Sequence, residues 1–213
     1  DAVHHAGGRI FAQLWHVGRI SHSYYHGKQP VAPSPIPPTG RAYTPEGFKD
    51  YEVPHELTVD EIRGVVGEFR RGAQVAHEAG FDGVEIHGAN GYLVDQFLQT
   101  GSNQRTDEYG GTPEARTRFL LEVLDAVTSV WPSDRVGVRV APAGGAGGIR
   151  DNDPVETFTH VAQALDQRGL AYMHVVEAPV GTNSPDERNV CSTELVRAAY
   201  NGTLISAGGY TPE

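Results

Sequence analysis

Apolar residues follow two alternating patterns along the chain, one with helical spacing and one of strand length. Four segments place apolar residues on one helical face and begin with a side chain that can cap a helix. We expect these helices to begin at Thr58, Thr112, Asp153 and Ser192 or Thr193, and to end near Gly80, Trp131, Gly169 and Gly202. Five short apolar runs accompany them, at residues 10–15, 83–87, 136–140, 172–176 and 203–207. This alternation predicts a parallel β-sheet covered by helices, either a doubly wound open sheet or a (β/α)8 barrel.

The number of strands is too small for a complete barrel. A (β/α)8 barrel has eight strands in about 250 residues, whereas this sequence offers five. Residues 1–7 resemble the last turn of a helix, and Thr211-Pro212-Glu213 resembles the start of another. We therefore expect residues 1–213 to form a single partial barrel domain of about five βα units. Because its edge strands would be unpaired, we expect it to associate, for example as a homo-oligomer, or to belong to a longer chain.

The connection from residue 17 to residue 57 is long and rich in proline. It contains the stretch 30–38 together with His22, Tyr24 and Tyr25. A linker is one interpretation, but the segment lies between a strand and its covering helix. Long loops inside compact domains usually cap a site, so we predict that residues 17–57 form a capping loop.

Composition and charge indicate which kinds of molecule the protein does not bind. Apolar residues make up 38% of the chain and charged residues 21%, as in an enzyme-like globular domain. The formal net charge of −10 repels phosphate backbones and anionic lipid, so we expect neither nucleic acid nor a membrane as partner. No apolar run reaches the roughly 20 residues that span a bilayer. Cys191 is the single cysteine; we expect it to be inert and assign the chain to the cytoplasm.

The richest candidate site follows the predicted strand at residues 83–87. His87, Asn90 and Tyr92 are polar, and the glycines between them let the backbone turn tightly. His and Asn can both donate hydrogen bonds to one carbonyl oxygen and stabilise the charge that develops on it. Tyr can supply a proton without adding a fixed charge. On spacing alone an alternative is equally open, in which His87 and Asn90 satisfy backbone groups of their own loop.

Three further places suit a ligand. Gln13 and Trp15 end the first strand, where the Gln amide fits the mixed edge of a heterocycle and Trp can wall a pocket; a capped core strand fits them equally well. Arg139 interrupts an apolar strand and needs a polar partner, either a ligand or a buried carboxylate such as Glu85. Gly208-Gly209 offers backbone N–H groups to a phosphate.

Three stretches that contain or adjoin these residues, 13–19, 83–93 and 101–111, resemble signatures of the Old Yellow Enzyme family of FMN-dependent ene-reductases. The resemblance covers essentially the whole chain. It implies a TIM barrel, incomplete in this chain, whose five strands would be the third to the seventh. The glycine-rich run at residues 144–148 differs from the more polar loop that the family usually has there.

The resemblance also implies a reaction. The chain would be an oxidoreductase that uses NAD(P)H to reduce the C=C bond of α,β-unsaturated carbonyl compounds, with an enone, nitro compound or quinone as substrate. His87 and Asn90 would hold the carbonyl oxygen while hydride passes from flavin N5 to the β-carbon. Tyr92 would protonate the α-carbon, and Trp15 would line the substrate pocket.

The implied cofactor is FMN, with NADPH or NADH as reductant in a ping-pong cycle. Gln13 would contact the pyrimidine ring of the flavin, and Arg139 would lie near its N1 and C2 oxygen, where a positive charge favours the anionic reduced form. Gly208 and Gly209 would meet the phosphate.

Other functions fit these residues less well. Both lysines, Lys28 and Lys49, lie in the 17–57 connection, so a Schiff-base aldolase lacks its strand lysine. No HxH or HExxH spacing indicates a metal hydrolase, and no GxGxxG indicates a Rossmann domain. The alternative from another class is a catalytically silent barrel remnant that self-associates or docks on a partner.

Overall fold

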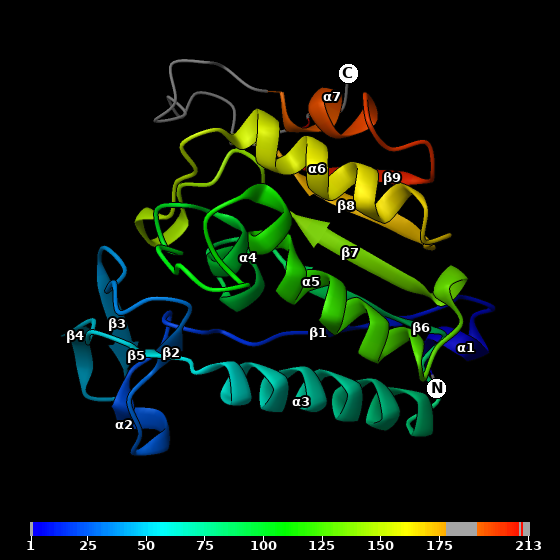
Figure 1. The fold of residues 1–213 in the computed structure, drawn as a ribbon. Coiled ribbons are helices and arrows are strands. Elements are labelled where there is room, and N and C mark those ends of the chain that lie inside the picture. The colour runs from blue at the N-terminus through cyan, green and yellow to red at the C-terminus, as the bar shows by residue number, and fades with distance from the viewer. Residues whose placement is uncertain (1, 178–190, 209, 211–213) are drawn as a thin grey trace.

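A five-stranded parallel sheet forms the centre of the molecule (Figure 1). The computed structural model describes residues 2–177, 191–208 and 210. The strands lie in the order β1-β6-β7-β8-β9, and every neighbouring pair is parallel. Their bounds are β1 (Phe11–Leu14), β6 (Gly83–Gly88), β7 (Val136–Val140), β8 (Tyr172–Val176) and β9 (Leu204–Ala207). The five predicted strands are therefore confirmed to within one residue at each end.

Helices cover one face of this sheet (Figure 1). They are α3 (Val59–Glu78), α5 (Pro113–Thr128), α6 (Pro154–Asp166) and α7 (Ser192–Arg197). Successive strand residues point to opposite faces. Those that point toward the helices, such as Val84, Ile86, Val138 and Met173, are fully buried and pack with apolar helix residues. The core therefore lies between the sheet and this single layer of helices.

The first three of these helices begin as the sequence predicts. Thr58 accepts the N–H of Glu61, whose carboxylate accepts the N–H of Thr58 at 2.8 Å, so the capping box is complete. Thr112 and Asp153 cap α5 and α6, each followed by proline at the first helical position.

Helix α7 begins at Ser192 as predicted, but its cap comes from elsewhere in the chain. The Glu177 carboxylate, just after β8, accepts the N–H groups of Ser192 at 3.0 Å and Thr193 at 2.7 Å. The sequence suggested that a local hydroxyl caps this helix, but the carboxylate of Glu177 caps it through a tertiary contact. Residue 209 and the expected helix start at Thr211 lie outside the described residues.

The other face of the sheet, here called the inner face, carries polar side chains. Gln13 on β1 donates to Glu85 on β6, with Nε2 and Oε1 2.6 Å apart. Glu85 also contacts His174 on β8, with Oε2 and Nδ1 3.0 Å apart. His87, Arg139 and His174 are register partners on adjacent strands, so they too share this face.

Residues 17–57 are more ordered than the single long loop that the sequence suggested. They form α2 (Ser23–His26), β2 (Val31–Ala32), β3 (Arg41–Thr44), β4 (Gly47–Asp50) and β5 (His55–Glu56). β3 and β4 pair as an antiparallel hairpin, and β2 pairs with β5 in parallel. None of these four strands contains an apolar run like those of the central strands, so the sequence did not distinguish them from loop. All of these elements gather at the end of the molecule toward which the arrowhead of β7 points (Figure 1).

Besides α2, one further helix was not predicted. Helix α4 (Leu93–Leu98) follows β6, and each of its six residues is buried. Because a helix buried on every side has no polar face, it shows no helical period in the sequence.

Three shorter pieces complete the described chain: α1 (Ala2–His5), which agrees with the expected helical turn before β1, and the 3-10 turns η1 (Ser133–Arg135) and η2 (Ala146–Gly148). Within the described ranges, no helix has both the length and the apolar content needed to cross a bilayer.

Candidate active site

Three aromatic rings meet at the carboxyl ends of β1 and β6. The ring centroids of His87 and Tyr92 lie 5.1 Å apart, and the Trp15 ring lies 4.7 Å from Tyr92 and 5.8 Å from His87. Trp15 follows β1, His87 lies near the end of β6, and Tyr92 immediately precedes α4. The structure thus brings together three of the predicted site residues. Trp15 is 53% exposed, so this cluster opens at the molecular surface.

His87 is held as a neutral imidazole with a defined tautomer. Its Nδ1 accepts the backbone N–H of Ala89 at 3.2 Å, so the ring proton resides on Nε2. Burial and the nearby positive charge of Arg139 lower the pKa of His87 to about 4. At neutral pH the side chain therefore offers one N–H donor and no charge.

A sharp turn carries the chain from β6 into α4. Asn90 has φ 58°, the one positive value outside glycine in the described residues, and Gly91 follows with φ 78°. A Cβ on Gly91 would approach the carbonyl oxygen of Ala146 to 2.7 Å, so both conformation and space require glycine there. The turn places the half-buried Asn90 three residues beyond His87, at the same end of the sheet.

Segment 17–57 reaches this end of the sheet at several points. Thr39 donates its N–H to the Gly147 carbonyl at 2.9 Å, and Arg19 donates its N–H to Gln96 Oε1 on α4 at 3.2 Å. Burial and the phenol of Tyr92 raise the pKa of Tyr51. The capping role of the segment stays a prediction.

Comparison with known proteins decides the family. The NADH:flavin oxidoreductase / NADH oxidase family matches residues 1–213. The chain belongs to this family, which is the Old Yellow Enzyme family of the resemblance. It is 43% identical over 221 residues to 12-oxophytodienoate reductase 2 of Arabidopsis thaliana, covering 100% of this chain and 58% of the relative.

Solved structures of relatives agree with the fold. Morphinone reductase superposes with a TM-score of 0.90 at 43% identity, over 99% of this chain and 58% of that one. The old yellow enzyme homologue from Zymomonas mobilis superposes with a TM-score of 0.94 at 38% identity, over 99% of this chain and 59% of that one. The prediction of an incomplete TIM barrel is therefore confirmed, and the chain spans about three fifths of the length of these relatives.

Old Yellow Enzyme relatives are FMN- and NAD(P)H-dependent oxidoreductases, and the inner face fits a polar ring. The Nε of Arg139 and the Nε2 of His174 are buried there and have no hydrogen-bond partner in the described part of the chain. A buried polar atom without a partner costs about 1–3 kcal/mol, and a ligand that satisfies both atoms would recover this energy. The exposed Gln13 side chain lies on the same face. This set of polar side chains therefore fits a flavin ring in this family member.

Glu85 is not the partner of Arg139, which was one of two alternatives left by the sequence. Both carboxylate oxygens of Glu85 are engaged, by Gln13 and by His174. Burial by itself would raise the pKa of Glu85, but these hydrogen bonds outweigh it and hold the pKa below its ordinary value. Within the described residues this leaves a ligand as the remaining candidate for Arg139.

The predicted phosphate site is described only in part. Gly208 follows β9 with φ 122°, and a Cβ there would lie 3.0 Å from the Glu177 carbonyl oxygen, so the position requires glycine. Gly209 lies outside the described residues. The pair remains a prediction as a phosphate cradle.

The stretch at residues 101–111, which resembles a family signature, packs beside the site without entering it. Asn103 is buried and donates to the carbonyls of Phe97 and Tyr109, both at 2.7 Å. Arg105 donates to the carbonyls of Pro33 at 3.0 Å and Leu57 at 2.6 Å. This stretch therefore joins α4 to segment 17–57. The polar residues of this stretch were the one feature of the sequence that could have indicated that it joins other segments.

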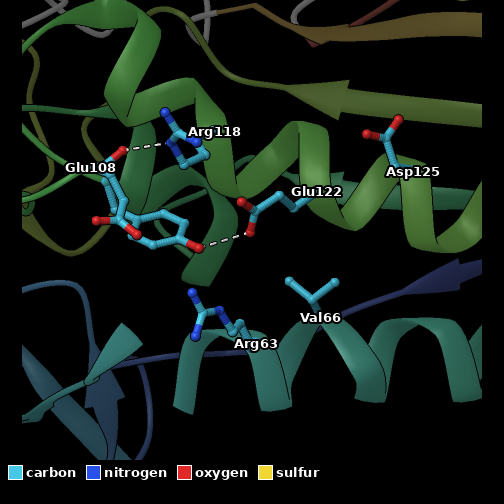
Figure 2. A pocket seen from close by; sticks show the side chains of 7 residues that line it. Arg63, Val66, Glu108, Arg118, Glu122 and Asp125 are labelled. Carbon is cyan, nitrogen blue, oxygen red and sulfur yellow. Dashed lines mark hydrogen bonds between the residues drawn. The ribbon is translucent and has the colours of Figure 1, made fainter. Parts of the chain in front are cut away.

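A hollow lies on the helical side of the molecule, between α3 and α5 (Figure 2). Its volume is about 440 Å³, and it is lined by Arg63, Val66, Glu108, Tyr109, Arg118, Glu122 and Asp125. The Tyr109 hydroxyl donates to Glu122 at 2.9 Å, and Arg118 donates to the Glu108 carbonyl at 2.8 Å. Because the sheet separates this hollow from the inner face, it is not part of the candidate active site.

Proposed function

We propose that this chain forms the substrate-binding and proton-donating part of an FMN-dependent ene-reductase, which uses NADPH or NADH to reduce the C=C bond of α,β-unsaturated carbonyl compounds. The observation that carries the proposal is the neutral, buried His87, whose ring centroid lies 5.1 Å from that of Tyr92 and 5.8 Å from that of Trp15. Membership of the flavin oxidoreductase family supports it. Enones, nitro compounds and quinones are the candidate substrates.

His87 and Asn90 bind the substrate carbonyl oxygen in this proposal. The His87 imidazole and the Asn90 amide are both uncharged donors. They therefore stabilise the negative charge that develops on the oxygen in the transition state more than they stabilise the uncharged carbonyl of the bound substrate. The low pKa of His87 matters here because it keeps the imidazole from delivering its own proton. Protonation of the α-carbon is therefore left to another group.

Tyr92 supplies that proton. Its ring is held between Trp15 and His87 by edge contacts, which restrict the phenol to a small range of positions. A phenol is uncharged before it donates, so the site needs no buried cationic acid; the phenolate that remains regains a proton from solvent before the next turnover. Trp15 forms the open wall against which an unsaturated ring can lie.

FMN, when bound, supplies hydride transfer from the reduced nicotinamide to the substrate. Gln13 and Arg139 would hold its ring on the inner face, and Gly208 with Gly209 would meet its phosphate. Solved morphinone reductase contains tetrahydroNAD, which supports a reduced nicotinamide as the reductant of this chain.

Turnover of cyclohexenone tests the proposal. With FMN and NADPH, the wild-type chain should consume the enone, and the double variant His87→Ala plus Asn90→Ala should lower kcat/KM by about 10²–10³-fold. Tyr92→Phe keeps the ring contacts and should slow turnover by about 10²-fold. Thr117→Val is the matched control, because Thr117 is buried in α5 and its hydroxyl has no partner in the described chain. Equal kcat/KM in the double variant and the wild type would contradict these roles.

The open edges of the sheet favour a second candidate, a silent barrel remnant that self-associates. β1 and β9 each pair with one neighbour among the described strands, and Ile205 on β9 is 41% exposed. Sedimentation together with flavin absorbance separates the two candidates. A chain that takes up FMN and turns yellow is expected from the enzyme. A colourless oligomer that binds no FMN would favour the remnant.

A further inference from the structure

Both backbone polar groups of Gly91 are held by two consecutive side chains of α4. Asp95 Oδ2 accepts the Gly91 N–H at 2.8 Å, and Gln96 Nε2 donates to the Gly91 carbonyl at 2.7 Å. Both side chains are completely buried. Gly91 stands between Asn90 and Tyr92, so this pair grips the turn that carries two of the proposed site residues.

Gln96 also holds the segment that follows β1. Its Oε1 accepts the N–H of Arg19 at 3.2 Å, and its Nε2 donates to the Val17 carbonyl at 3.3 Å. The backbone at Gly18 packs directly on this amide, since a Cβ there would approach Gln96 Oε1 to 2.4 Å. One buried amide therefore connects the chain after Trp15 with the chain before Tyr92.

Other contacts also hold the turn from β6 to α4: Ala89 donates its N–H to His87 Nδ1 at 3.2 Å, and Leu93 donates its N–H to the His16 carbonyl at 3.0 Å. Tyr92 donates its N–H to the Ala89 carbonyl at 3.2 Å, and Asn90 stands in a left-handed conformation that costs a residue other than glycine about 1–2 kcal/mol. A conformation of this cost persists when the surroundings over-determine it. Asp95 and Gln96 contribute to that constraint.

We propose that Asp95 and Gln96 are positioning residues of the reaction, which hold Asn90 and Tyr92 in the orientation that binds and protonates the substrate. The inference rests on the proposed function for its catalytic consequence. The clamp on Gly91 itself is a structural claim that can be tested without turnover.

The chain offers a conservative variant at Asp95. In Asp95→Asn the side-chain oxygen can still accept the Gly91 N–H, and the new amide can donate to Gln99, whose Oε1 has no partner in the described chain. Asp95→Ala removes the acceptor. Gln96→Met keeps the volume but removes both the donors and the acceptor, and it carries the test if Asp95→Ala does not fold. Thr117→Val again controls for substitution inside a buried helix.

Three measurements are made on the full 213-residue chain: hydrogen exchange of the Gly91 amide by NMR, FMN affinity by fluorescence, and kcat/KM for cyclohexenone with NADPH. A buried hydrogen bond of ordinary strength corresponds to about a tenfold effect. We expect Asp95→Ala and Gln96→Met to speed Gly91 exchange about tenfold and to lower kcat/KM about tenfold, with FMN affinity unchanged. Asp95→Asn should stay within about threefold of the wild type in all three.

Two results would overturn the inference. If hydrogen exchange of the Gly91 amide is unchanged in both Asp95→Ala and Gln96→Met, these side chains do not hold Gly91, whatever the effect on turnover. A loss of kcat/KM that is matched by an equal loss of FMN affinity would indicate general disruption instead of positioning. If the wild-type chain does not turn over cyclohexenone, the proposed function fails, and Gly91 exchange alone then decides whether the clamp exists.

Discussion

A backbone hydrogen bond decides which proton His87 offers. Because Nδ1 accepts from Ala89, the donor must be Nε2, and because the ring is buried beside Arg139, it stays uncharged. The sequence indicated that His87 follows a strand and that a donor there suits a carbonyl. Its tautomer and its low pKa depend on neighbours from another strand and on burial, which a single sequence does not display.

Burial raises the pKa of Asp95, whereas an ion pair lowers the pKa of an exposed carboxylate. Its pKa is raised from 3.8 to about 7, mainly by burial, although Gln99 and Gly91 donate to it. Between about pH 4 and pH 7 the folded chain therefore keeps a proton that the unfolded chain has released. The contribution of this group to the free energy of unfolding must fall as the pH rises through that window.

Asp95→Asn tests this sign. The substitution removes the titration, so the free energy of unfolding of the wild type, relative to that of the variant, should fall by roughly 2–4 kcal/mol between pH 4.5 and pH 7.5. Urea unfolding of both proteins at the two pH values measures the difference. A difference that does not change with pH, or that changes in favour of the wild type, would show that Asp95 is ionised in the folded chain.

At the scale of elements, the sequence was most informative where local chemistry decides the outcome. Thr58, Thr112 and Asp153 each start a helix because their side chains accept N–H groups within the same turn. Helix α4 and the short strands of segment 17–57 were missed. Helix α4 is buried on all sides and so shows no polar face, and the short strands contain no apolar run like those of the central strands. The cap that Glu177 provides for α7 was missed because it comes from a distant part of the chain.

Gly18 offers a direct test of how tightly the two loops are packed at the site. Its φ is 58°, and a Cβ would meet the Gln96 amide, whereas Gly27 has φ 65° with open space around it. Gly27→Ala should cost about 1 kcal/mol of the free energy of unfolding through backbone conformation alone. Gly18→Ala should cost at least about 2 kcal/mol more, because the clash adds to the same backbone term. Chemical unfolding of both variants measures the difference, and equal losses would mean that the Gln96 contact is loose.

At the scale of the whole molecule, the chain is one continuous section of a barrel. Its five strands run in chain order, one face is covered by helices, and the inner face is lined by Gln13, Glu85, His87, Arg139 and His174. The alternation of strands and helices predicted a parallel sheet covered by helices, the count of strands indicated an incomplete barrel, and the family resemblance implied the TIM barrel in particular. The comparisons with relatives agree, since the chain superposes on about three fifths of each solved structure.

The inner face shows where prediction from sequence stopped. Arg139 was identified because a charge in an apolar strand needs a partner, but the choice between Glu85 and a ligand required cross-strand register. Register also decides that Glu85 meets Gln13 and His174, a pairing that joins residues 72 and 89 positions apart. His174 did not stand out in the sequence because nothing local distinguishes a buried strand histidine from an exposed one.

The most direct test of the account is to observe His87 while a substrate binds. In the chain loaded with FMN and without a reductant, the ¹⁵N resonances of the His87 ring can be followed by NMR as cyclohexenone is added at pH 7. We expect a saturable shift at Nε2, a ring that stays neutral throughout, and a weaker response when Asn90 is replaced by Ala. A His87 ring that is doubly protonated, or an Nε2 signal that does not move at saturating enone, would contradict the claim that neutral donors bind the carbonyl oxygen.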